Sequence, residues 1–431
     1  MAFDRFQDFL GSLVKGQRRG FFSGNGRPSI DELLDKLMGN TGEVSAIVAA
    51  RELLDDYIKS DDDAKLAFFN NLEQNYNADE VAVKLAYNSY SSDPSSTNLN
   101  RLSKTAEPRR LNLLRRLNQT PGATHDLVEM RSDLLKLLKD NPQLRAVDDN
   151  FVRLFKSWFA RSFLVLQTID WSTPAAILER IIRYEAVHEI KDWEDLRRRI
   201  QPANRRCFAF FHPALTDEPL IFVEVALGWE IPNSINSILT DTKAEDIEAT
   251  DFTTATFYSI SNCQPGLQHI SFGNFLIKQV VLGLQAEFPS IKQFVTLSPI
   301  SGFKRWLQST PEDEASEITA SKARIQQIEN TPEAIEENAQ LIEQLVFNYL
   351  LSAKKGKYPA DSVARFHLGN GAMIHQLHTA ADTSEKGLAQ AHGTMVNYLY
   401  DLRYIERNHE RYVTEGTVEY NDKLKPLVIK P

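Results

Sequence analysis

Between residues 257 and 303 the chain changes its hydrophobic pattern in an order that few folds can accommodate. An apolar run from Phe257 is followed by a loop with Gly266 and Gly273, a stretch of helical periodicity, a second apolar run, and Ser298-Pro299. Short apolar runs bounded by glycines and prolines are typical of buried strands. The order therefore predicts strand, loop, helix and strand, with Ser298 at the carboxyl end of the second strand.

This unit also predicts a kind of substrate. A loop that opens onto a helix N-terminus offers free backbone N–H groups and the positive end of a dipole, which suits a pyrophosphate. A serine at the end of a parallel strand suits chemistry on what that pyrophosphate carries, such as the acyl group of an acyl-CoA. The alternative is an ordinary strand–helix turn, because Gly266 and Gly273 form neither a dinucleotide-binding nor a P-loop fingerprint.

Around this unit the periodicity predicts an α+β protein. Ser29 and Glu32 form a capping box, and helical periodicity continues to about residue 165. Strand patterns follow from residue 207, and we expect strands over 207–211, 220–227, 255–262, 293–297, 366–374 and 395–402, with a helix over about 273–288. We predict an all-α domain over residues 1–165 and a mixed-sheet domain over residues 166–431.

Composition excludes several classes of protein. The net charge of −9 over 431 residues argues against a nucleic-acid-binding protein. No apolar run reaches the ~18 residues of a membrane span. The two cysteines, Cys207 and Cys263, exclude a disulfide framework and fit a reducing compartment. We therefore expect a cytoplasmic protein that binds neither nucleic acid nor membrane.

The candidate catalytic residues also have plain structural interpretations. Ser298 precedes Pro299, which is typical of a helix N-cap with proline at the first helical position. His367 has apolar neighbours and could be a hydrogen-bonded core residue. Tyr398 and Tyr400 alternate, so one of them is expected to face the core. His375 and His378 have no third ligand nearby, so no metal site is predicted.

Several motifs taken together favour the catalytic interpretation of these residues over the structural one. The order of strands and helix resembles the acetyltransferase-like (GNAT) fold, in which the strand before the helix splays from the strand after it. Over residues 185–405 the sequence resembles the malonyl-CoA decarboxylase family through motifs that include Phe257-Tyr-Ser-Ile-Ser, Gly273-Asn-Phe-Leu-Ile-Lys278, Leu297-Ser-Pro-Ile-Ser-Gly-Phe303, Phe366-His-Leu-Gly-Asn-Gly-Ala372 and Met395-Val-Asn-Tyr-Leu-Tyr400.

The resemblance implies roles for particular residues. Ser298 and His367 match the family's catalytic pair, and Tyr400 matches a late tyrosine that would orient them. The family's CoA-contacting loop matches residues Gln268, His269, Ile270, Ser271, Phe272, Gly273 and Asn274. Some members carry a glutamate two residues before the helix-opening glycine, where this chain has Ser271. A role that depends on that carboxylate is therefore not expected here.

The resemblance also implies a reaction, which converts malonyl-CoA to acetyl-CoA and CO2 through a thioester enolate. His367 would protonate C2, and Ser298 would place the malonyl carboxylate. No metal or organic cofactor is expected, because the thioester itself accepts the electrons, and residues 1–165 would mediate homo-oligomerisation. Two other hypotheses stay open from the residues alone: an acyl-CoA-dependent acyltransferase of GNAT fold, and a non-catalytic helical scaffold.

Overall fold

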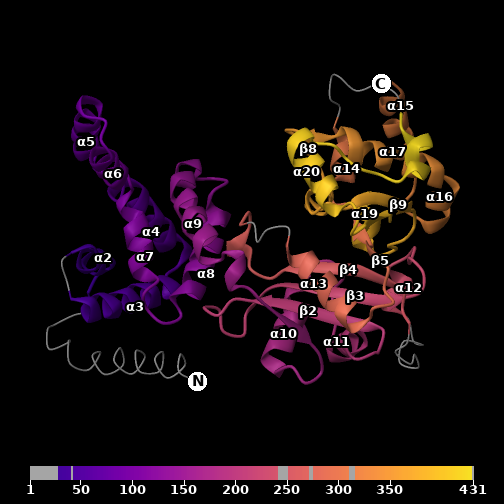
Figure 1. Cartoon of the computed structure of the whole chain (residues 1–431), viewed down its shortest axis with the longest axis horizontal. Coiled ribbons are helices and arrows are strands. Elements are labelled where there is room, and N and C mark those ends of the chain that lie inside the picture. The colour runs from indigo at the N-terminus through magenta and orange to yellow at the C-terminus, as the bar shows by residue number, and fades with distance from the viewer. Residues whose placement is uncertain (1–27, 40–41, 241–250, 271–274, 310–315, 430–431) are drawn as a thin grey trace. The chain divides into compact units, whose positions relative to one another are not determined.

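The computed structural model describes residues 28–39, 42–240, 251–270, 275–309 and 316–429. These residues divide into two compact units, each described by itself (Figure 1). The helical unit covers residues up to 164 together with 212–216 and 264–271. The sheet unit covers 165–211, 217–263 and the chain from 272 onward. The division falls beside the predicted boundary, but two later segments lie with the helices.

The helical unit is built from α-helices, and none of its described residues forms a strand, as the periodicity predicts. Ser29 and Glu32 form the predicted capping box, with Ser29 N donating to Glu32 Oε2 over 2.8 Å. The helices are α2 (Ile30–Met38), α3 (Glu43–Lys59), α4 (Asp62–Asn75), α5 (Glu80–Ser92), α6 (Ser96–Thr105), α7 (Arg109–Leu117), α8 (Ala123–Leu137) and α9 (Arg145–Trp158). Short 3-10 turns lie at Pro142–Leu144, Arg161–Phe163 and Pro265–Leu267.

One buried arginine explains why residues 264–271 lie with the helices. Arg131 of α8 is fully buried and pairs with Asp148 of α9 over 2.8 Å. Its Nη1 donates to the carbonyls of Gly266 and Gln268, over 2.6 and 2.9 Å. A Cβ on Gly266 would lie 1.9 Å from the carbonyl oxygen of Val128, so only glycine allows this approach. The loop that precedes α13 is thus anchored on α8.

The sheet unit contains an eight-stranded sheet in the order β1-β2-β3-β4-β5-β10-β6, with β9 paired to β10. Among the described strands, β4 and β5 are the one parallel pair, and α13 (Phe275–Glu287) lies between them in sequence. The strands are β1 (Val165–Ile169), β2 (Arg205–Phe211), β3 (Pro219–Gly228), β4 (Thr254–Asn262), β5 (Gln293–Thr296), β6 (Ser298–Pro299), β9 (Met373–His378) and β10 (Met395–Leu399), and a separate hairpin pairs β7 (Lys354–Lys355) with β8 (Tyr358–Pro359).

Helices of the sheet unit cover and connect these strands. Ile177, Leu178 and Ile181 of α10 are buried in an apolar cluster that also contains Cys207 of β2 and Phe222 of β3. The helices are α10 (Ala175–Tyr184), α11 (Trp193–Ile200), α12 (Asn236–Leu239), α13, α14 (Phe303–Gln308), α15 (Ser316–Ile325), α16 (Pro332–Glu337), α17 (Ala339–Ser352), α18 (Ser362–Gly369), α19 (Glu385–Ala391) and α20 (Ile405–Glu415), with a 3-10 helix at Asp422–Leu427.

The parallel pairing between β4 and β5 is short. Its register runs from Thr254↔Gln293 to Phe257↔Thr296 and then stops, so residues 258–262 of β4 continue beside β3 without a β5 partner. The parallel pairing therefore ends with β5, in the segment where the acetyltransferase-like fold has its splay. The predicted fold class, a helical N-terminal part followed by a mixed sheet of this type, is confirmed.

Two local predictions are wrong, and one strand was missed. Residues 366–369 are helical, because Asp361 caps α18, and the strand begins only at Met373. Ser298 is not a helix cap: it lies in edge strand β6 opposite Val396, and α14 begins after Gly302. Proline tolerates such an edge position, where no ladder hydrogen bond is required of it. Strand β1 was not predicted at all.

Candidate active site

The three residues predicted to be catalytic meet in the sheet unit. Ser298 Oγ lies 3.2 Å from Nε2 of His367, and Nδ1 of the same ring lies 2.7 Å from the Tyr400 hydroxyl. All three side chains are buried, at 5%, 3% and 2% exposure. They come from β6, from the last turn of α18, and from the residue that follows β10. Segments far apart in the sequence therefore build one hydrogen-bonded chain.

Asp361 fixes the helix that carries His367. One carboxylate oxygen accepts the backbone N–H groups of Val363 and Ala364, both over 2.9 Å, which caps α18. The other oxygen accepts the N–H of Gly302 over 3.1 Å, in the turn after β6. The same carboxylate thus connects the helix of His367 to the turn that follows the strand of Ser298.

Thr296 extends the chain beyond Ser298, and sequence reasoning missed it. The Ser298 hydroxyl donates to Thr296 Oγ1 over 2.8 Å, and the N–H of Tyr398 donates to the same oxygen over 3.2 Å. Asn397 Nδ2 donates to the Thr296 carbonyl over 2.8 Å. The signal was present, since two hydroxyl residues separated by one position project from the same face of an extended chain.

The hydrogen bonds assign the protons on His367. Because Ser298 gives its hydroxyl proton to Thr296, the facing Nε2 must carry a proton, and Nδ1 then accepts from Tyr400. Burial lowers the pKa of His367 to about 3 and raises the pKa of Tyr400 well above its ordinary value. The imidazole also stacks on Tyr398, with centroids 4.7 Å apart. The His367 imidazole and the Tyr400 hydroxyl are consequently neutral near pH 7.

This arrangement provides O–H and N–H donors in a site of low polarity. Donors of this kind stabilise a developing oxyanion strongly, because little water competes with them. An anionic group beside the imidazole would also raise the pKa of His367, since an opposite charge favours the protonated form. The site can therefore change from neutral donor to acid when an anion enters.

The predicted CoA loop is only partly described. Gln268, His269 and Ile270 belong to the helical unit, where the first two side chains are exposed and the third is buried. His269 has φ 65°, an uncommon left-handed conformation for a residue with a Cβ. Ser271, Phe272, Gly273 and Asn274 lie outside the described residues. The anchor of this loop, Arg131, was missed, although an arginine within a leucine stripe is a recognisable signal.

The other histidines weighed in the sequence make ordinary contacts. His378 Nε2 lies 2.5 Å from Oδ1 of Asn397, and His375 Nδ1 lies 3.2 Å from Nδ2 of Asn421. In the part of the chain that the structure describes, no group of three or more histidine, cysteine, aspartate or glutamate side chains is arranged to hold a metal ion.

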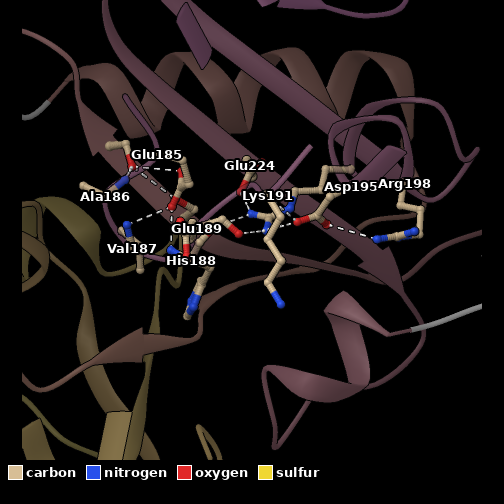
Figure 2. Close-up of polar contacts among 12 residues, drawn as sticks. Glu185, Ala186, Val187, His188, Glu189, Lys191, Asp195, Arg198 and Glu224 are labelled. Carbon is tan, nitrogen blue, oxygen red and sulfur yellow. Dashed lines mark hydrogen bonds and ion pairs between the residues drawn. The ribbon is translucent and has the colours of Figure 1, made fainter. Parts of the chain in front are cut away.

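A second buried polar cluster lies in the sheet unit (Figure 2), and we call it the Glu185 cluster. Its residues are Glu185, His188, Arg199, Glu224, Ser259 and Ser261. The Glu185 carboxylate accepts the N–H groups of Val187 and His188, over 2.8 and 2.7 Å, and the hydroxyls of Ser259 and Ser261, over 2.8 and 3.0 Å. Sequence reasoning did not identify this cluster.

Arg199 and Glu224 are both buried members of the Glu185 cluster. Arg199 lies 3.3 Å from Oε2 of Glu224 and donates to the carbonyls of His188 and Glu189. Glu224 is fully buried, and burial together with nearby Glu185 raises its pKa to about 8. Its Oε1 has no partner among the described residues.

Together the short parallel pair β4–β5 in a mixed sheet and the Ser298–His367–Tyr400 chain define an acetyltransferase-like domain with a buried donor site, preceded in the sequence by a helical domain. The model of the malonyl-CoA decarboxylase C-terminal domain matches residues 162–430, and that of the N-terminal domain matches residues 76–159. The chain therefore belongs to the malonyl-CoA decarboxylase family.

Individual relatives support the same family assignment. The mitochondrial malonyl-CoA decarboxylase of Anser anser anser is 34% identical over 351 residues, which cover 74% of this chain and 69% of the relative. The mitochondrial malonyl-CoA decarboxylase of Rattus norvegicus is 34% identical, and the match covers 73% of that relative. The crystal structure of malonyl-CoA decarboxylase from Rhodopseudomonas palustris is 45% identical, with a TM-score of 0.87, covering 93% of this chain and 100% of that one. The crystal structure of malonyl-CoA decarboxylase from Agrobacterium vitis is 45% identical, with a TM-score of 0.84.

Proposed function

We propose that this protein decarboxylates malonyl-CoA to acetyl-CoA and CO2. The observation that carries the proposal is the hydrogen-bonded chain from Ser298 through His367 to Tyr400, in a member of this family. Loss of CO2 leaves two electrons in an enolate whose charge sits on the thioester oxygen. The enzyme must hold that charge and return one proton to C2.

The neutral imidazole sets the order of events. A neutral imidazole is a much weaker acid than an imidazolium, and His367 is neutral before substrate binds. The malonyl carboxylate, held by Ser298, would bring a negative charge beside the ring and raise its pKa. A proton taken from solvent would then sit on the ring, with Nδ1 donating to the Tyr400 oxygen. When CO2 leaves, Nε2 gives its proton to C2, and His367 is neutral again.

The decisive experiment supplies malonyl-CoA alone. Chromatography should show acetyl-CoA and CO2 forming in equal amounts with no acceptor added, and in D2O the acetyl group should carry one deuterium. An acyltransferase would leave malonyl-CoA intact until an amine or thiol is added. Unchanged malonyl-CoA, with transfer of a whole malonyl group on addition of an acceptor, would replace decarboxylation with that alternative.

We propose that the reaction needs no metal or organic cofactor, because the thioester carbonyl accepts the electron pair as the C–C bond breaks. Dialysis against a chelator should leave kcat unchanged. We also propose that residues 268–274 bind the CoA moiety. Support comes from the anchoring of this loop by Arg131, which holds Gln268 and His269 outward.

We further propose a homo-oligomer formed through residues 1–165. Helix α5 buries only Ala86, whereas Val81, Leu85 and Tyr87 are exposed at 70%, 59% and 57%. Within the helical unit, α5 and α6 extend away from the other helices (Figure 1). A second copy would cover the face of this helix that Val81 and Leu85, four residues apart, share. Sedimentation should show a species larger than 49 kDa that Leu85→Asp dissociates, and a monomer at micromolar concentration would contradict the proposal.

The cellular location is a separate proposal. No helix in the described residues is long and apolar enough to span a bilayer. The curated relatives named above are mitochondrial proteins by name. We propose a cytoplasmic location, supported by the two cysteines, which are buried and unpaired. Fractionation of the native host with an antibody to the chain would distinguish the compartments.

A further inference from the structure

A pocket of about 430 Å³ lies in the sheet unit, on elements that flank the catalytic strands without including any catalytic candidate. Its lining residues are Lys304, Leu307 and Gln308 of α14, Gln326 just after α15, and His392 just after α19. We call it the His392 pocket. Gln308 and Gln326 are exposed, while Leu307 and His392 are buried, at 2% and 1% exposure. The pocket thus has a polar, accessible part and a buried part.

His392 is the unusual member of this lining. Both of its ring nitrogens are buried, and neither has a hydrogen-bond partner among the described residues. Buried polar atoms are nearly always satisfied, so an imidazole without any partner indicates a missing ligand or ordered water. Its backbone has φ 49°, the left-handed conformation with which it ends α19, and its N–H is bonded to the carbonyls of Gly387 and Leu388. The backbone of His392 is thus accounted for by the helix end, whereas its ring is not.

The described residues that line the pocket carry one positive charge, on Lys304. Lys304 forms no ion pair with any described carboxylate, and its charge, after burial, is a second cause of the lowered pKa of His392. The imidazole is therefore neutral and offers one N–H donor and one acceptor. Gln326 uses one amide hydrogen on the Leu307 carbonyl over 2.6 Å, which leaves the other available. An ammonium group and several N–H donors surround the same space.

We propose that the His392 pocket binds a small oxyanion, a carboxylate or phosphate group, between Lys304 and the His392 ring. Such a group matches the single positive charge and accepts hydrogen bonds from the ammonium, imidazole and amide N–H groups. A cation would meet the unpaired ammonium, and a neutral ligand would leave its charge without a counterion. The inference does not depend on the proposed decarboxylation, because the pocket shares no lining residue with the catalytic chain.

The position of the pocket gives the bound anion a structural effect. His392 begins the turn into β10, and Lys304 lies on the helix that follows β6. These two strands pair at Met395↔Pro299 and Val396↔Ser298. An anion held by both residues would link the helix after β6 to the turn before β10. Binding should therefore raise the melting temperature of the protein.

The test uses the full chain labelled with ¹³C at histidine Cε1, titrated with inorganic phosphate, sodium acetate or sodium chloride at matched ionic strength. The His392 resonance is assigned with His392→Asn, which keeps a residue that tolerates the left-handed conformation. We expect a saturable shift of that resonance, and a rise in melting temperature, with phosphate or acetate but not with chloride. Whichever anion binds more tightly identifies the group.

Matched variants test whether the anion binds in the His392 pocket. Lys304→Met should weaken binding at least tenfold, whereas Lys292→Met, which removes an exposed lysine elsewhere in the same unit, should leave it unchanged. Equal loss in both variants, or no shift of His392 with either oxyanion, would overturn the proposal. Displacement of the bound anion by saturating acetyl-CoA would also overturn it, because the pocket would then be part of the acyl-CoA site. None of these readouts requires catalytic activity.

Discussion

The sheet unit contains two buried polar networks that differ in their charge. The Ser298–His367–Tyr400 chain is neutral, and its members are linked one after another. The Glu185 cluster is charged, and a carboxylate at its centre collects four donors. A linear neutral chain can pass a proton or accept an anion, whereas a saturated carboxylate has no capacity left for a substrate. We therefore interpret the Glu185 carboxylate as structural and the Ser298–His367–Tyr400 chain as the candidate for chemistry.

The largest expected effect separates two buried histidines. Burial lowers the pKa of His367 to about 3 and that of His188 to about 4, so both are neutral. If only the first is catalytic, His367→Gln should reduce kcat by ~10²–10⁴, the usual share of general acid catalysis. His188→Gln, the matched control, should keep kcat within about threefold after correction for folded protein. Steady-state assays on malonyl-CoA make the comparison.

A double mutant sharpens this result. Ser298→Ala should also lower kcat strongly, but adding it to His367→Gln should cost much less than the product of the two effects, because paired groups act as a unit. Independent, multiplicative losses would contradict a shared role. A large loss of kcat in His188→Gln would contradict the distinction between the two networks.

The second prediction concerns stability. Glu185→Ala leaves two backbone N–H groups and two serine hydroxyls without their acceptor, and each unsatisfied buried donor costs about 1 kcal/mol or more. We expect the free energy of unfolding to fall by roughly 3–5 kcal/mol, measured by urea denaturation. The folded fraction should retain its kcat, and Glu189→Ala, at an exposed neighbour, should change neither quantity.

A smaller effect tests the far end of the catalytic chain. Tyr400→Phe removes the hydroxyl 2.7 Å from Nδ1 of His367 and leaves the ring packing in place. One hydrogen bond is worth about 1–1.5 kcal/mol, so kcat should fall roughly tenfold while KM and stability change little. Tyr398→Phe is the control, since its hydroxyl has no partner among the described residues although its ring stacks on His367. Equal effects in the two variants would remove Tyr400 from the site.

A further comparison concerns the pH dependence of stability in the Glu185 cluster. The pKa of Glu224 is raised from 4.5 to about 8, mainly by burial, so folding favours its protonated form. Its contribution to stability is complete below pH 4.5 and is lost as pH rises to about 8, by at most ~1.4 kcal/mol per pH unit. Glu224→Gln stays neutral and lacks this loss.

The difference in unfolding free energy between wild type and Glu224→Gln should therefore shift in favour of the variant from pH 5 to 8 and then level off. Denaturation curves at matched ionic strength measure it. A difference that is constant with pH would show that Glu224 is ionised throughout, as a tight ion pair with Arg199 would require.

Much of the fold followed from local pattern. Periodicity separated the helices from the sheet because side-chain spacing along the chain is a local property. The capping box at Ser29 and the strands of the β2–β3 hairpin were predictable for the same reason. The identity of the catalytic candidates came from motifs shared with a family, and the physics of single residues favoured a cap for Ser298 and a core position for His367.

Only the tertiary structure decided what these residues do to one another. Ser298 lies 69 residues before His367 in sequence, and Tyr400 lies 33 residues after it, so no periodicity could indicate that their atoms meet. The helical state of residues 366–369 depends on Asp361, whose carboxylate also holds Gly302. The charge of each buried group likewise depends on its surroundings. The sequence determined which elements form and which side chains are available, and packing decided which donors face each other, because burial and hydrogen bonding are properties of segments brought together from distant parts of the chain.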